Sequence, residues 1–140
     1  MRILALDWGT VRIGAAITDE DQRIAFPLDK TIAASEYVAE IKQLVLEKGV
    51  GMILLGFPLN LQGDQGSSAE KVKQFAREIN RETGVAVELV DERFTSEAAG
   101  NLLEDQGLNG KQQREIKDNI AAQLMLQQYI DTRNNNKIKP

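Results

Sequence analysis

Acidic residues occupy three places in this sequence from which they can do chemistry. Asp7 follows four apolar residues, the pair Asp91 and Glu92 follows a second, mostly apolar run, and Asp118 precedes a pair of alanines near the C-terminus. Carboxylate oxygens are the ligands that Mg²⁺ and Mn²⁺ prefer in proteins. Two such ions bridged by Asp7 can activate water and stabilise the leaving oxygen of a phosphodiester. If the three places meet in the fold, the chain can support metal-dependent hydrolysis.

Two missing residue types narrow the chemistry further. The chain has no histidine and no cysteine. Ser-His-Asp and Cys-His nucleophiles, histidine bases, imidazole and thiolate metal ligands, and disulfides are therefore excluded. Only carboxylates, amines and hydroxyls remain as reactive groups, which suits a site built from oxygen ligands.

Length and charge indicate the size of the protein and its setting. A chain of 140 residues fits one domain, and we assign residues 1–130 to that domain and residues 131–140 to a polar C-terminal tail. No apolar run approaches the ~18 residues of a membrane span, so we expect a cytoplasmic protein without a membrane partner. The net charge of −4 argues against bulk attraction to nucleic acid, although it leaves room for a local basic patch.

Hydrophobic periodicity predicts strands and helices that largely alternate along the chain. The expected strands span residues 2–7, 12–18, 24–31, 50–57 and 85–90. The expected helices lie between Ser35 and Gly49, between Ser67 and Gly84, from 95 to 103, and from 112 to 129. The first two strands are spaced as an antiparallel hairpin, and Pro27 favours an edge position for the third. The unbroken apolar run 50–57 predicts a central strand covered on both faces.

This order predicts an α/β fold with a mixed five-stranded sheet and helices on both faces, because parallel crossovers are right-handed and cover the sheet. Active sites of open α/β sheets lie outside the carboxyl ends of the central strands, where Asp7 and the Asp91-Glu92 pair stand. The alanines after Asp118 allow its helix to approach the sheet closely. We therefore expect Asp7, Glu92 and Asp118 to be catalytic and to bind metal, with Asp91 as the other candidate ligand.

Each acidic residue also has an ordinary structural interpretation. Asp7 can end a strand and accept turn amides, and residues 91–93 can be a helix entry with surface ion pairs. Asp118 can pair with Arg114 one turn earlier, a surface contact of about 0.3–0.5 kcal/mol. An acid on the covered face of the sheet is costly unless a metal, an arginine or helix-terminal amides compensate it.

Basic and aromatic residues near these acids suggest contacts with nucleic acid. Lys111, Arg114 and Lys117 recur every third residue before Asp118, and they can either guide a phosphate backbone or form a solvated helix face. Trp8 can stack on a base or fill space beside the hairpin.

Four ordered motifs resemble the YqgF family, also called RuvX. They are LDWGTVRIGAA at residues 6–16, GFPLNLQG at 56–63, DERFT at 91–95 and KDNIAA at 117–122. Together they span most of the chain, from about Arg2 to Tyr129. Two departures are mild: Val11 stands where lysine is common in the family, and Phe94 where leucine is common.

The resemblance implies a Holliday-junction-resolvase-like nuclease with a ribonuclease H fold. It also implies processing of the 5′ end of pre-16S rRNA or resolution of branched DNA, with Mg²⁺ or Mn²⁺ as the cofactor. The family's acids match Asp7, the Asp91-Glu92 pair and Asp118. We expect contacts to structured RNA or branched DNA from seven polar and basic residues: Thr10, Arg12, Asn60, Arg93, Lys111, Arg114 and Lys117. The protein is expected to be a monomer or a homodimer.

Two other functions fit parts of the sequence. One is a nucleic-acid-binding module without catalysis. The other is a nucleotide-binding protein, because the Asp7–Thr10 segment also resembles the phosphate-binding hairpin of the actin and sugar-kinase ATPases. Those enzymes hold the nucleotide between two domains, and only one domain fits in this chain.

Overall fold

The computed structural model describes the backbone of residues 1–9, 11–57, 67–91 and 110–138, and the side chains of residues 1–9, 11–56, 70–90 and 116–134. The predicted helix from 95 to 103 lies outside the described residues.

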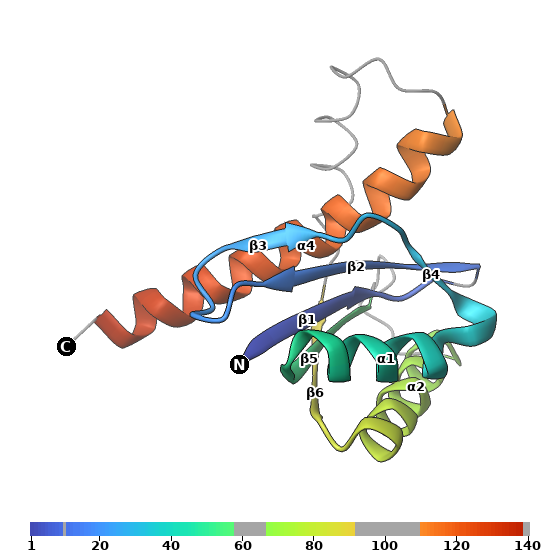
Figure 1. Ribbon diagram of the computed structural model, residues 1–140, viewed down its shortest axis with the longest axis horizontal. Coiled ribbons are helices and arrows are strands. Elements are labelled where there is room, and N and C mark those ends of the chain that lie inside the picture. Colours follow the sequence, from blue (N-terminus) through green and yellow to red (C-terminus); the bar gives the residue numbers. More distant parts are fainter. Residues whose placement is uncertain (10, 58–66, 92–109, 139–140) are drawn as a thin grey trace.

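Within that part of the chain, six strands form one mixed sheet (Figure 1). They are β1 (Arg2–Asp7), β2 (Arg12–Thr18), β3 (Ala25–Pro27), β4 (Ile32–Ala33), β5 (Val50–Phe57) and β6 (Ala86–Asp91). The order is β3-β2-β1-β5-β6, with β4 also paired to β2. β2 is antiparallel to β1, whereas β5 is parallel to β1 and β6 to β5. Four of the five predicted strands are confirmed to within one residue. The third, predicted over 24–31, is confined to Ala25–Pro27, with Pro27 in an edge strand, and β4 is an additional short strand.

Helices cover both faces of the sheet, as predicted. A 3₁₀ turn over Ala34–Glu36 leads into α1 (Tyr37–Lys48), and α2 (Ser67–Thr83) lies beside α1 on the same face (Figure 1). The helix α4 (Gly110–Ile138) crosses the other face. Gly49 ends α1 in the left-handed conformation, with φ of 68°, and donates its N–H to the Val45 carbonyl.

Side chains of β1 alternate between two hydrophobic cores. Leu4 and Leu6 belong to the core beneath α1 and α2, and Ile3 and Ala5 belong to the core beneath α4. The α4 core also holds Ala16 of β2 and four residues of the helix: Ala122, Met125, Leu126 and Ile130. Because strand side chains alternate with a period of two, Asp7 has the parity of the α4 face.

The final helix is longer than the sequence predicted. The expected end was Tyr129, followed by a polar tail from residue 131, but α4 continues to Ile138. Arg133 accounts for part of this extension, because its guanidinium lies 5.7 Å from the centre of the Tyr129 ring and donates to Gln22 Oε1 at 2.7 Å. Hydrophobic periodicity does not detect such polar contacts.

Three amide side chains of α4, four residues apart, bind the main chain at one edge of the sheet. Asn119 accepts from the Ala15 N–H at 2.9 Å and donates to the Leu28 carbonyl at 2.8 Å. Gln123 donates to the Ala25 carbonyl, and Gln127 accepts from the Ala25 N–H. These bonds, which we term the amide ladder, fix the position of α4 along β2 and β3.

The closest approach between α4 and the sheet is at Gly14 of β2. A Cβ atom placed on Gly14 would lie 2.1 Å from the carbonyl oxygen of Asp118, a backbone atom that cannot move aside alone. A glycine is therefore required at this position by the helix above it. No helix in the described part of the chain is both long and apolar enough to cross a membrane.

Replacing Gly14 with alanine is expected to lower the free energy of unfolding by about 1–3 kcal/mol, because the new methyl group must displace α4. Chemical denaturation of the variant measures this loss. Gly51→Ala is the matched control, since a Cβ there meets only the Met1 side chain, which can swing away. Equal stability of the two variants would contradict the close contact.

Candidate active site

Asp7 ends β1 at the middle of the sheet. It pairs with Gly14 of β2 on one side and with Gly56 of β5 on the other. Its side chain is half-buried. Both lateral neighbours are glycines, and Asp7 lies at the carboxyl end of a central strand, as predicted.

Asp118 lies directly over the strand residue that pairs with Asp7. The Asp118 carbonyl makes the close approach to Gly14, and Gly14 is the register partner of Asp7. Paired strand residues have Cα atoms about 4.5–5.5 Å apart, so the backbones of the two acidic residues flank one glycine. The predicted approach of Asp7 and Asp118, from opposite ends of the chain, is therefore present in the fold.

An arginine compensates the charge of Asp118. The Arg12 Nε donates to Asp118 Oδ2 at 2.5 Å, and each side chain is about 30% exposed. Arg12 begins β2 two residues before Gly14, so both have the parity of the α4 face. The sequence had offered Arg114 as the partner of Asp118. The structure shows Arg12, a residue distant in sequence, as a partner of Asp118, and this contact joins α4 to the start of β2. The Arg114 side chain lies outside the described residues.

The third predicted acid is at the end of β6. Asp91 is the last residue of that strand and pairs with Phe57 of β5. Its side chain, and the whole of Glu92, lie outside the described residues. Among the residues whose side chains are described, no three acidic residues gather as a metal-binding group. Asp7 and Asp118 are the two expected ligands whose side chains the structure describes.

The predicted nucleic-acid contacts are only partly described. Lys117 is half-buried on α4 next to Asp118. Lys111 and Arg114 lie in the first turns of α4, but their side chains are outside the described part. Three further predicted residues, Thr10, Asn60 and Arg93, also lie outside it.

Asn119 is a positioning residue that the sequence analysis missed. It is 3% exposed, and it holds both the Ala15 N–H and the Leu28 carbonyl. The sequence did contain a signal for it: Asn119 lies three positions before Ala122, on the buried stripe of α4. A buried amide needs hydrogen-bond partners, so a polar residue at such a position indicates contacts with another segment. By fixing the rotation of α4, Asn119 places its neighbour Asp118 over Gly14.

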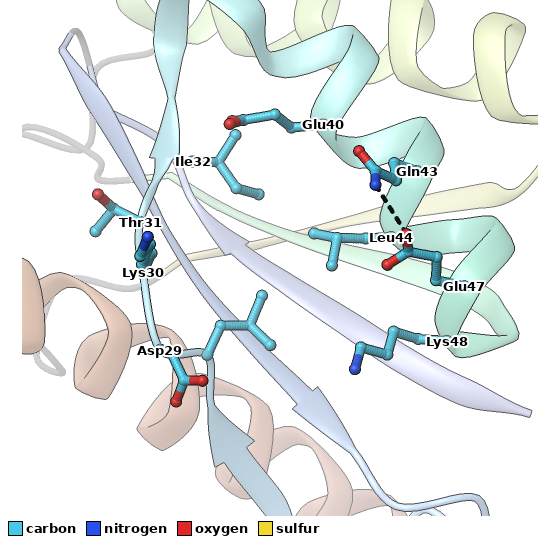
Figure 2. A pocket seen from close by; sticks show the side chains of 10 residues that line it. Asp29, Lys30, Thr31, Ile32, Glu40, Gln43, Leu44, Glu47 and Lys48 are labelled. Atoms are coloured by element: carbon cyan, nitrogen blue, oxygen red, sulfur yellow. Dashed lines mark hydrogen bonds between the residues drawn. The ribbon is translucent and has the colours of Figure 1, made fainter.

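A cavity between α1 and residues 28–32 does not belong to this site (Figure 2). It has a volume of about 400 Å³ and combines Leu44 and Ile32 with charged groups such as Glu47 and Lys48. None of the predicted site residues lines it.

The fold agrees with comparisons to known proteins. The chain belongs to the RuvX family, described as Holliday junction resolvase, whose model matches residues 1–132. A protein of Chloroflexus aurantiacus is 43% identical over 96% of this chain and 89% of its own length. A protein of Moorella thermoacetica is 38% identical over 94% of this chain and 95% of its own length. Both are named as pre-16S rRNA nucleases. The family predicted from the four motifs is confirmed.

Solved structures with a similar fold include two resolvases. RuvC of T. thermophilus, in complex with a Holliday junction substrate, matches with a TM-score of 0.54 and 16% identity over 96% of both chains. The Fowlpox virus resolvase, in complex with Holliday junction DNA, matches with a TM-score of 0.60 and 11% identity over 94% of this chain and 98% of that one. At these identities the similarity shows the fold, and the predicted ribonuclease H-like class is confirmed.

The Arg12–Asp118 contact should be measurable as a coupling in the protein without metal. In a double-mutant cycle with Arg12→Met and Asp118→Asn, we expect a coupling free energy of about 0.5–1 kcal/mol, because the pair is partly exposed. Chemical denaturation in a chelating buffer gives the four stabilities. The same cycle on Lys42 and Glu82, whose charged atoms are 3.6 Å apart, is the control. The pairing is refuted if the coupling of Arg12 with Asp118 is zero within error.

Proposed function

We propose that this protein is a metal-dependent nuclease that hydrolyses phosphodiester bonds and processes the 5′ end of pre-16S rRNA. The observation that carries the proposal is the meeting of Asp7 and Asp118 on either side of Gly14, at the carboxyl end of a central strand. Membership of the RuvX family supports the same chemistry.

The residues present fit hard divalent cations. Both described acids offer carboxylate oxygens, and the ion pair of Asp118 with Arg12 indicates that this place favours a positive partner. We propose Glu92 rather than Asp91 as the third ligand, because Asp91 ends β6 directly after Val90, which packs against the α4 core, and so has the parity of the opposite face. Bound Mg²⁺ or Mn²⁺ would activate water and stabilise the leaving oxygen.

Basic side chains of this chain would hold the scissile strand. Arg12 neutralises Asp118, and Lys117 adds a cation one residue away on the same helix. Lys111 and Arg114, on the same helix, are proposed as further cations for the strand in a protein whose net charge is −4. Thr10, Asn60 and Arg93 are proposed as further contacts to nucleic acid.

RNA is favoured over branched DNA as the substrate. The relatives named for pre-16S rRNA are 38–43% identical to this chain, whereas the neighbours seen with Holliday junctions are 11–16% identical. The greater similarity makes the RNA substrate the stronger inference. A four-way junction is the second substrate to test, because the family is described as Holliday junction resolvase.

Cleavage assays with Mn²⁺ test this proposal on three substrates: a pre-16S rRNA 5′ leader, a four-way junction and an RNA/DNA hybrid. Asp7→Asn and Asp118→Asn should each lower the rate by at least about a hundredfold, because loss of a supporting group alone already costs 10–100-fold at metal sites. Chelation of the metal should abolish cleavage.

The matched control is Asp29→Asn, which removes an exposed carboxylate far from Asp7 in sequence and should leave the rate unchanged. Circular dichroism checks that each variant is folded. Unchanged cleavage in both the Asp7 and the Asp118 variants would show that the activity does not use this site. Preference for the junction over the leader RNA would reassign the substrate.

A further inference from the structure

A cavity of about 340 Å³ opens beside Asp7 on the other face of the sheet. Trp8 and Gly9, the two residues that follow Asp7, both line it. Asp7 has the parity of the α4 face, whereas Trp8 packs against the core beneath α1 and α2. Successive Cα atoms are 3.80 Å apart, so the cavity begins one residue from the candidate active site.

Aromatic side chains are concentrated in this cavity. The chain has one tryptophan, two tyrosines and four phenylalanines, and Trp8, Tyr37 and Phe75 all line it. The rings of Tyr37 and Phe75 are 4.4 Å apart between centroids and tilted by 36°. Phe75 is 6% exposed, whereas Trp8 and Tyr37 are half-buried, so the latter two keep surface available for stacking.

The polar lining comes from one face of α2. Lys71, Gln74 and Glu78 are spaced by three and four residues, and all three line the cavity. Glu78 accepts a hydrogen bond from the Tyr37 hydroxyl. Burial and this bond raise the pKa of Tyr37 to about 12, so its hydroxyl remains a donor at neutral pH. Among the described lining residues, the charges of Lys71 and Glu78 balance, which gives little attraction for a bare phosphate.

We propose that this cavity binds an unpaired nucleobase of the substrate strand, next to the phosphodiester held at Asp7. Aromatic faces stack on any base. The amide oxygen of Gln74 and the carboxylate of Glu78 can accept hydrogen bonds from the amino groups of a base. The inference rests on the proposed nuclease function, since it is the scissile strand that would bring a base here. The cavity of Figure 2 has no aromatic lining and does not adjoin Asp7.

Trp8 provides the measurement, because it is the sole tryptophan. In the Asp7→Asn variant, which should leave the strand uncut, a short single-stranded RNA is titrated with Mg²⁺ present. DNA of the same sequence and an abasic strand of the same length are titrated in parallel. Both base-bearing strands should quench Trp8 emission to saturation, with the more strongly bound one identifying the sugar that is preferred. The abasic strand should leave the emission unchanged.

Substitutions in the same background test the contacts. Tyr37→Leu should weaken binding of the base-bearing strands about tenfold, the order of loss expected for one stacking partner, and should not affect the abasic strand. Gln74→Ala, at an exposed position that does not threaten folding, should weaken the same strands by a smaller factor. Phe26→Leu is the matched control, because Phe26 is 48% exposed on β3 and does not line the cavity.

Fluorescence anisotropy of labelled strands distinguishes failure of the base-site proposal from failure of the nuclease proposal. If the strands bind but Trp8 emission does not change, and Tyr37→Leu and Gln74→Ala bind as tightly as the parent, the base site is refuted while the nuclease proposal stands. If no strand, leader RNA or junction binds at all, the nuclease proposal fails and the base site fails with it.

Discussion

The contact of α4 with β2 at Gly14 is the constraint on which the site depends. The helix can lie this close only because residue 14 has no side chain, and the carbonyl of Asp118 occupies that space. Because Gly14 pairs with Asp7, the contact brings acids from the two ends of the chain to one place. The amide ladder then fixes the helix along its axis, so the contact is held at one register. A carboxylate placed in this way is positioned by backbone packing, which is stiffer than a loop.

Much of this arrangement could be predicted from sequence, because it follows from local periodicity. The period of two placed Asp7 with Ile3 and Ala5, and the alanines after Asp118 indicated a helix close to the sheet. Each of these patterns lies within a single strand or helix. The order of strands and helices likewise restricted the topology to a mixed sheet with crossovers, which the structure bears out.

Other features could not be predicted, because they depend on contacts between distant segments. Arg12 is the partner of Asp118, whereas a helix-based argument could consider only neighbours such as Arg114. Asn119 was missed for the same reason, since its partners lie on β2 and after β3. The end of α4 was placed too early because Arg133 extends it through contacts with Tyr129 and Gln22, which hydrophobic periodicity does not report.

The amide ladder affects how copies of this protein can associate with one another. An edge strand normally presents free N–H and carbonyl groups that invite another chain to add a strand, a common route to aggregation. On β3, both main-chain groups of Ala25 are already bonded to Gln123 and Gln127, and Pro27 has no N–H to offer. Side chains of a helix thus take the place of a neighbouring strand. Intermolecular sheet extension is blocked along β3, and self-association by that route is disfavoured from the moment α4 docks.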